Sequence, residues 1–230
     1  MKRFIVFSLI FVFFISLLSS CGKDNNMDEF WEFYNGKIKI FEKENEEFKG
    51  KRVDVVFLGD SLTDGYNVKE FYPEYTVLNR GISGDTSIWL EERLDVSLYA
   101  VQPKVAVMLI GANNMDTMLE NYESILKSFK ENAPNTKIVL LSLTSMSGEW
   151  GKKNQLAAYN NVQIKMYAEI YGYEYVDLYS ALLNLEDGEI YDEYTTDGGH
   201  LTKKGYEVLT SIIKPAIQKQ ISAWELENKN

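Results

Sequence analysis

The stretch VDVVFLGDSLT, residues 53–63, decides how this chain folds. Its opening part, residues 53–58, is almost entirely apolar, and a short apolar run of this kind predicts a strand buried on both faces, as strands of parallel sheets are. The Gly-Asp-Ser turn that follows puts Ser61 at the carboxyl end of that strand. Because open α/β sheets bind their ligands at this end of their strands, Ser61 is a candidate nucleophile.

Other segments continue the pattern through the rest of the chain. Short apolar runs predict further strands around residues 75–78, 104–110, 137–143 and 173–178. Amphipathic or capped segments predict helices at residues 28–49, 87–98, 117–132 and 154–171, and a last helix from about Lys203 that Pro215 kinks or splits. The alternation of strand and helix, without an internal repeat, predicts an α/β fold: a doubly wound, mostly parallel five-stranded sheet flanked by helices.

The first twenty residues, 1–20, are laid out like a secretory signal peptide. Lys2 and Arg3 precede an apolar stretch, residues 4–18, and small residues follow it. That stretch is shorter than the roughly 20 residues that a membrane-spanning helix needs. The layout therefore favours a cleaved signal peptide, and an uncleaved membrane anchor is the alternative.

Cys21 is the only cysteine of the chain and ends the sequence Leu-Ser-Ser-Cys, so that no disulfide can form within the chain. This sequence resembles the lipobox of bacterial lipoproteins, which implies that Cys21 is lipidated and becomes the first mature residue. Residues 21–27 are then a short polar tether, and residues 28–230 form a single domain. The resemblance implies a bacterial lipoprotein that is anchored to a membrane outside the cytoplasm, facing the periplasm or the cell surface.

The chain is acidic, with a formal net charge of −10 at pH 7. Negative charge of this size disfavours binding to nucleic acid and tight adsorption to anionic lipid headgroups. We therefore expect no nucleic-acid partner.

His200 is the only histidine, so that a serine hydrolase with a histidine base has a single candidate in this chain. Asp197 precedes it by three residues, and on a tight helical turn residues at this spacing face the same side. Asp197 could then bind one nitrogen of the His200 ring while the other points at Ser61, as a serine–histidine–carboxylate triad requires. A surface turn with an ion pair would produce the same spacing.

Four sequence blocks in order make the chain resemble the SGNH, or GDSL-type, hydrolases, a family of serine esterases and lipases. The blocks are Gly59-Asp60-Ser61-Leu62, Gly84 within the segment NRGISGD of residues 79–85, Gly111-Ala112-Asn113, and Asp197-Gly198-Gly199-His200. The Gly-x-Ser-x-Gly elbow of the α/β-hydrolases is absent, because Thr63 stands at the place of its second glycine.

The resemblance implies a flavodoxin-like sheet and an ester hydrolase without a cofactor or metal ion. Ser61 would attack the ester carbonyl, His200 would act as base and Asp197 would orient the imidazole ring. The oxyanion hole would consist of the backbone N–H groups of Ser61 and Gly84 and the side-chain amide of Asn113. The family's third block usually continues with an aspartate, for which this chain has Asn114.

Loops at the carboxyl ends of the strands should select the substrate. Trp150, Tyr191 and Tyr194 are the candidate substrate-binding side chains, although they could equally serve in packing. Because the chain has no long apolar insertion, we expect an open site for short acyl esters, such as acetyl groups on carbohydrate. The alternatives are a lysophospholipase or thioesterase, a lipid-anchored binding protein without turnover, and a metal-dependent phosphoesterase that uses Asp60, Asp197 and His200. The sequence does not indicate the oligomeric state.

Overall fold

The computed structural model describes residues 25–229. The predicted signal peptide, Cys21 and the first part of the predicted tether lie outside the described residues. The chain divides after Lys37 into two units, which are described separately. Helix α1 (Asn25–Glu47) spans this division and includes residues 25–27, the last part of the predicted tether. In the first unit, aromatic rings on this helix pack against one another, namely those of Phe30, Trp31 and Tyr34.

The larger unit contains the predicted five-stranded parallel sheet. Its strands are β1 (Val55–Gly59), β2 (Val77–Gly81), β3 (Val105–Leu109), β4 (Lys137–Leu141) and β5 (Glu174–Val176). They lie in the order β2-β1-β3-β4-β5, and all neighbours are parallel. The order reverses between β1 and β3, and the carboxyl ends at such a point form the crevice in which doubly wound sheets bind their ligands.

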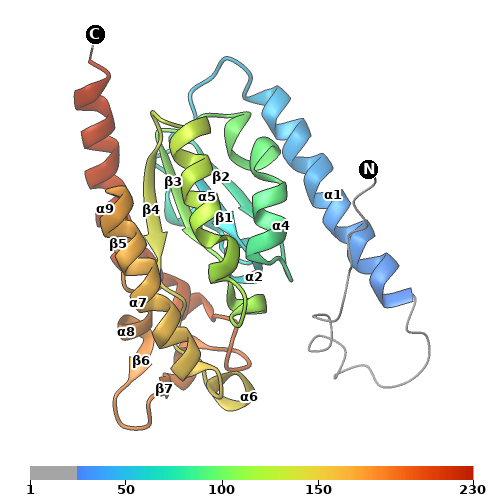
Figure 1. Ribbon diagram of the computed structural model, residues 1–230, viewed down its shortest axis with the longest axis vertical. Helices are drawn as coiled ribbons and strands as arrows, with labels where there is room; N and C mark the ends of the chain where they lie inside the picture. The colour runs from blue at the N-terminus through green and yellow to red at the C-terminus, as the bar shows by residue number, and fades with distance from the viewer. Residues whose placement is uncertain (1–24, 230) are drawn as a thin grey trace. The chain divides into compact units, whose positions relative to one another are not determined.

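Helices cover both faces of this sheet (Figure 1). One layer consists of α4 (Ser87–Glu92), α5 (Leu119–Asn132) and α7 (Asn154–Tyr171), which pack with Val56 and Leu58 of β1. The opposite face carries α9 (Lys203–Glu227), which packs with Val55 and Phe57. Because successive strand residues point to opposite faces, an almost uninterrupted apolar run fills two cores at once.

Short elements that the sequence analysis did not predict occupy the loops. They are α2 (Ser61–Asp64), α3 (Val68–Phe71), a π-helical turn η1 (Asp95–Tyr99), a 3₁₀ turn η2 (Ala112–Asn114), α6 (Gly148–Gly151), α8 (Tyr179–Leu182), a hairpin of β6 (Leu183–Asn184) and β7 (Glu189–Ile190), and a 3₁₀ turn η3 (Asp192–Tyr194). The prediction of one helix over residues 87–98 was therefore wrong in its second half, because α4 ends at Glu92 and a π-helical turn follows.

Pro215 does not split the last helix. Helix α9 continues from Lys203 to Glu227 with Pro215 inside it. A proline in a helix interior removes one backbone hydrogen bond and crowds the carbonyl of the preceding turn. The neighbouring residues Ile213 and Ile217 are buried in the core, and their packing offsets that cost.

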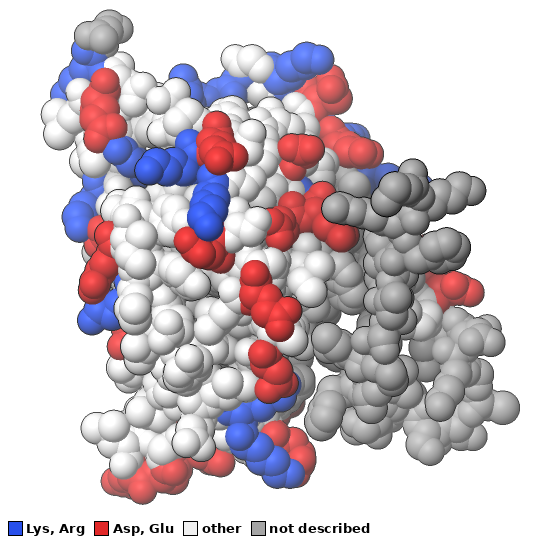
Figure 2. Space-filling view, viewed as in Figure 1, with Lys and Arg blue, Asp and Glu red and all other residues white. Residues whose placement is uncertain are grey.

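The surface of the described chain carries charges of both signs. On the face drawn in Figure 2, lysine and arginine side chains stand beside aspartate and glutamate side chains rather than in a continuous basic patch. Ion pairs such as Lys137–Glu227, at 2.6 Å, account for part of this arrangement. Of the helices between residues 25 and 229, none is both long and apolar enough to cross a bilayer.

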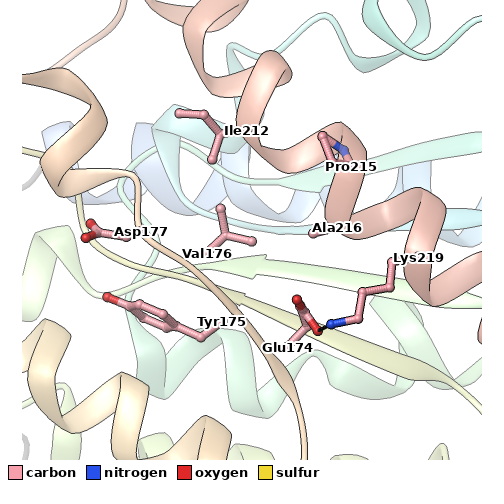
Figure 3. A pocket seen from close by; sticks show the side chains of 8 residues that line it. All are labelled: Glu174, Tyr175, Val176, Asp177, Ile212, Pro215, Ala216 and Lys219. Atoms are coloured by element: carbon pink, nitrogen blue, oxygen red, sulfur yellow. Dashed lines mark hydrogen bonds and ion pairs between the residues drawn. The ribbon is translucent and has the colours of Figure 1, made fainter.

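A shallow groove runs between the edge strand β5 and helix α9 (Figure 3). Val176 and Ile212 contribute apolar lining, and Lys219 pairs with Glu174 at 2.6 Å. None of the predicted catalytic residues lines this groove. The candidate site lies instead at the carboxyl end of β1.

Candidate active site

Ser61 is placed by the end of β1 and the start of α2. It follows Asp60, which caps α2 by accepting a hydrogen bond from the backbone N–H of Leu62 at 3.1 Å. Ser61 is the first residue of that helix, and the N–H of a first helical residue has no acceptor within the helix. The turn therefore presents both the hydroxyl and the backbone N–H of Ser61.

His200 and Asp197 come from the loop that precedes α9. The backbone of this loop closes on itself, because the carbonyl of His200 accepts from Thr196 N at 2.9 Å and from Thr195 Oγ1 at 2.7 Å. The carbonyl of Gly198 also accepts from Ser147 N at 2.9 Å. These bonds hold the loop in one conformation next to the segment that follows β4.

A continuous chain of hydrogen bonds joins the three predicted triad residues. His200 Nε2 lies 3.0 Å from Ser61 Oγ, and His200 Nδ1 lies 2.7 Å from Asp197 Oδ2. The other carboxylate oxygen of Asp197 accepts from the backbone N–H of His200 at 2.7 Å and of Gly199 at 2.9 Å. The structure therefore brings Ser61, Asp197 and His200 together as the sequence predicted.

The ionisation of Asp197 determines how the ring of His200 is used. Partial burial acts to raise the pKa of Asp197, but the backbone and ring N–H groups of His200 and the N–H of Gly199 outweigh it and lower this pKa below its ordinary value. An ionised carboxylate only accepts hydrogen bonds. His200 Nδ1 must then carry the proton, which leaves Nε2 free to accept the proton of Ser61.

The predicted oxyanion donors come from three neighbouring loops. Gly84 follows β2 and has a φ of +82°, a backbone conformation that side chains other than glycine rarely adopt. Asn113 lies in the 3₁₀ turn after β3, and its Nδ2 donates to the backbone carbonyl of Asp85 at 2.8 Å. A side-chain amide has two N–H donors, so a second one remains for a ligand.

Asp64 ties the Gly84 loop to α2, a role that the sequence analysis missed. Its Oδ2 accepts from the backbone N–H of Ser83 at 3.3 Å and from the hydroxyl of Ser83 at 2.8 Å. Gly84 is thus flanked by Ser83, which is bonded to α2, and by Asp85, which is bonded to Asn113. The elements that carry the three predicted donors are linked directly to one another.

The sequence matches a known family over most of the larger unit. Residues 57–208 match the model of the GDSL-like lipase/acylhydrolase family. The chain belongs to this family.

Individual relatives of this GDSL-like acylhydrolase agree with the assignment. The human isoamyl acetate-hydrolyzing esterase 1 homolog is 28% identical over 181 residues, which cover 65% of this chain and 71% of that protein. A GDSL-like lipase structure from Bacteroides thetaiotaomicron is 28% identical with a TM-score of 0.69, over 79% of this chain and 97% of that one. An acetyl-xylooligosaccharide esterase from Geobacillus shares the fold at 22% identity, with a TM-score of 0.60 over 72% of this chain and 94% of that one. The chain is therefore an ester hydrolase of the SGNH/GDSL type.

Asn114, where the family usually has aspartate, belongs to a buried hydrogen-bond network in this acylhydrolase. Its Oδ1 accepts from the backbone N–H of Ser87 at 3.2 Å, and its Nδ2 donates to the Ser87 hydroxyl at 2.9 Å. That hydroxyl in turn donates to Asn121 Oδ1 at 2.8 Å, and Asn121 Nδ2 donates to Glu91 at 3.0 Å. The network uses the amide hydrogen of Asn114, which a carboxylate does not have.

The three candidate substrate-binding aromatics of the acylhydrolase have different surroundings. Trp150 lies beside the catalytic loop, with its ring 6.4 Å from that of His200 in an edge-on arrangement. Tyr191 and Tyr194 contact each other at 5.4 Å, and Lys204 of α9 lies over the ring of Tyr194. The structure brings Trp150 to the triad, whereas Tyr194 contacts the start of α9 and Tyr191 is 40% exposed.

Asp60 of the acylhydrolase caps a helix in a buried position. It is 1% exposed, and burial raises its pKa to about 7 against the lowering effect of the Leu62 N–H. A buried carboxyl that bonds backbone is poorly placed to share a metal with Asp197. Between residues 25 and 229, no group of three or more histidine, cysteine, aspartate and glutamate side chains is arranged to hold a metal ion.

Proposed function

We propose that this GDSL-like acylhydrolase cleaves carboxylic esters through an acyl-enzyme intermediate, with Ser61 as nucleophile, His200 as general acid and base, and Asp197 as the group that orients and stabilises the imidazole ring. The observation that carries the proposal is the unbroken chain of hydrogen bonds from Ser61 through His200 to Asp197. Serine is a weak nucleophile by itself, and an adjacent base within hydrogen-bond reach activates it.

The acylation step begins with attack of Ser61 Oγ on the ester carbonyl carbon. His200 Nε2 takes the hydroxyl proton as the new C–O bond forms, and the carbonyl π electrons move onto oxygen to give a tetrahedral oxyanion. Collapse of this intermediate breaks the bond to the leaving alcohol, and His200 returns the proton to the alcohol oxygen. The ionised Asp197 stabilises the imidazolium that exists between these two proton transfers.

The oxyanion would be stabilised by the N–H groups of Ser61 and Gly84 and by the amide of Asn113. Donors that are held in place before the charge develops need no reorganisation during the reaction, and each is worth about 10²- to 10³-fold in rate. The links from Asp64 to Ser83 and from Asn113 to Asp85 supply this prior order.

Deacylation reuses the same residues. His200 removes a proton from a water molecule, and the resulting hydroxide oxygen attacks the acyl carbon. The second tetrahedral intermediate then collapses to the carboxylic acid, and His200 returns the proton to Ser61 Oγ. The enzyme is regenerated, with one ester bond and one water molecule consumed.

We further propose that the substrate is a short acyl ester, such as an acetyl group on carbohydrate. Two observations support this choice: the triad side chains are accessible, with that of His200 43% exposed, and the Trp150 ring lies beside it. A tryptophan face can pack on an apolar sugar face while its N–H remains available for a hydrogen bond. Relatives whose names specify acetate or acetyl esters point in the same direction.

Hydrolysis of p-nitrophenyl acetate, butyrate and octanoate by the purified chain tests the proposal. We expect turnover of the short esters by the wild type and none by Ser61→Ala. The control is Ser222→Ala, which removes an exposed hydroxyl from α9 and should leave activity unchanged. A preference for octanoate would favour a lysophospholipase or thioesterase instead, and absence of turnover with acetylated xylo-oligosaccharides as well would favour a binding protein.

For location, we propose that the chain is a membrane-anchored lipoprotein of the cell envelope, with lipid on Cys21. The support is the sequence alone: a basic start, an apolar stretch and the Leu-Ser-Ser-Cys ending. Cys21→Ser should move the protein from the membrane to the soluble fraction, or leave its precursor unprocessed. Unchanged, fully processed membrane association in this variant would refute anchoring through Cys21.

A further inference from the structure

Arg93 is a buried cation at the end of α4. It is 4% exposed, and all its nitrogens that can donate have partners. Nε and Nη2 both bind Asp85 Oδ2, at 2.8 and 2.7 Å, and Nη1 binds Ser97 Oγ at 2.7 Å. Nη2 also donates to the backbone carbonyl of Gly59 at 3.1 Å. One guanidinium thus joins the end of β1 to the loop after β2.

The groups that Arg93 binds are adjacent to the predicted oxyanion donors. Gly59 lies two residues before Ser61 in the same turn, and Asp85 directly follows Gly84. The backbone carbonyl of Asp85 also accepts from Asn113, as described above. The two groups that Arg93 binds are therefore close to every donor of the proposed oxyanion hole. Gly59 and Asp85 lie within two residues of Ser61 and Gly84, and Asp85 is joined to Asn113 by a hydrogen bond.

Arg93 and Asp85 form a buried ion pair, with 2.7 Å between Nη2 and Oδ2. Burial raises the pKa of Asp85 to about 6, while the charge and hydrogen bonds of Arg93 act to lower it. A buried ion pair of this kind is rarely better for stability than apolar side chains of similar volume, because both charges must leave water. The pair instead constrains geometry, because a planar guanidinium donates hydrogen bonds well only to acceptors in a narrow range of positions.

We propose that Arg93 is a positioning residue of the oxyanion hole: by binding Asp85 and the carbonyl of Gly59 together, it sets the spacing between Ser61 on one side and Gly84 and Asn113 on the other. The inference rests on the function proposed above. Arg93 does not touch the substrate, and it acts through the backbone of Gly59 and Asp85.

The test compares Arg93→Lys with a matched control, Arg80→Lys. Arg80 is also buried, but it binds Glu44 and Asn45 on α1 rather than an active-site loop. With a short p-nitrophenyl ester, Arg93→Lys should lower kcat about 10- to 100-fold and leave KM within about twofold, because a shift of the donors affects the transition state more than the bound ester. Arg80→Lys should lower the melting temperature and leave kcat of the folded enzyme within about twofold.

A double-mutant cycle separates positioning from general destabilisation. If Arg93 acts through the oxyanion donors, then Arg93→Lys made in an Asn113→Ala background should cost clearly less than in the wild type. Should Arg93→Lys fail to fold, Asp85→Asn replaces it in the same kinetic comparison. This variant removes the carboxylate charge that Arg93 binds but keeps the backbone carbonyl to which Asn113 donates.

Two results would overturn the inference: kcat of folded Arg93→Lys within about twofold of wild type, or an equal loss in the Asn113→Ala background. Ser61→Ala is assayed beside them. If Ser61→Ala retains activity, the proposed function fails and the role of Arg93 fails with it. If only the Arg93 result is negative, the triad stands and the positioning role alone is refuted.

Discussion

The two halves of the candidate site differ in their exposure to solvent. The oxyanion half consists of Gly59, Gly84, Asp85, Arg93 and Asn113 with their loops, and its charged members are buried, Asp85 at 0% and Arg93 at 4% exposure. The acid–base half consists of Asp197 and His200, whose side chains are 48% and 43% exposed.

This difference follows from what each half must do. Donors for an oxyanion gain strength when they are held rigidly in place. Asp85 and Arg93 are buried, and they fix the loops that carry the half-buried donor residues Gly84 and Asn113. A base that takes protons from serine and from water needs access to solvent, and its loop must leave room for the substrate. The stability of the protein should therefore depend on the first half, and its proton transfers on the second.

The largest effect is expected from removing the base of the acid–base half. His200→Gln should lower kcat by about 10⁴-fold or more, because no other histidine can take the proton of Ser61. Its melting temperature should change little, since the ring is exposed. The measurement is steady-state hydrolysis of a p-nitrophenyl ester together with thermal unfolding. Residual activity above a few per cent of wild type would contradict the role of His200.

The next effect concerns a donor of the oxyanion half. Asn113→Ala should lower kcat about 10²- to 10³-fold, as the loss of one oxyanion donor does in other acyl-transfer enzymes. It should also reduce stability, because the Asp85 carbonyl loses its partner at 2.8 Å. Kinetics combined with urea denaturation would separate the two effects. A loss of stability with unchanged kcat would show that Asn113 is not an oxyanion donor.

A smaller effect is expected from restoring the residue that the family usually has. Asn114→Asp should destabilise the protein by about 1–3 kcal/mol, the usual cost of leaving a buried polar group unsatisfied. The carboxylate would face the lone pairs of the Ser87 hydroxyl, and turning that hydroxyl round would deprive Asn121 of its donor. Urea denaturation measures the loss, with the exposed Asn132→Asp as control. Equal or greater stability of Asn114→Asp would show that the network tolerates either residue.

The last effect concerns stability alone and depends on pH and on Asp60. Its pKa of about 7 in the folded protein lies above the ordinary 3.8, so the folded state holds a proton that the unfolded state releases. This contribution to stability is complete below pH 4 and is lost as the pH rises towards 7, by at most about 1.4 kcal/mol per pH unit.

Asp60→Asn keeps the acceptor for Leu62 and cannot ionise, so its stability relative to wild type should increase from pH 5 to pH 8. Urea midpoints at the two pH values measure this difference, and Asp187→Asn in the exposed β6–β7 hairpin is the control. A constant difference between Asp60→Asn and wild type would mean that Asp60 is ionised throughout this range.

The features that the sequence predicted depend on local pattern. The strand at residues 53–58 appeared as β1 with a shift of at most two residues, because its apolar run is unambiguous. The Asp197–His200 pair followed from a spacing of three and from the presence of a single histidine. The family blocks located Gly84 and Asn113, which composition alone would not have distinguished from ordinary loop residues.

What could not be predicted depends on contacts between distant segments. The bond from Arg93 to Gly59 joins residues 34 apart, and no periodicity in either segment indicates it. The continuation of α9 through Pro215 could not be predicted either, because it depends on the core against which the helix packs. The aromatic residues near the site were named as one group, yet their rings have different neighbours: the ring of Trp150 contacts that of His200, and the rings of Tyr191 and Tyr194 contact each other.

The contact between Trp150 and Gly199 has a consequence for how these two residues can be substituted. A Cβ on Gly199 would lie 3.0 Å from the indole ring, closer than a methyl group normally approaches carbon or nitrogen. A side chain next to the catalytic histidine would therefore require the indole ring of Trp150 to shift by a few tenths of an ångström. Substitutions at Gly199 and Trp150 should therefore be strongly non-additive, because each residue sets the space that the other can occupy.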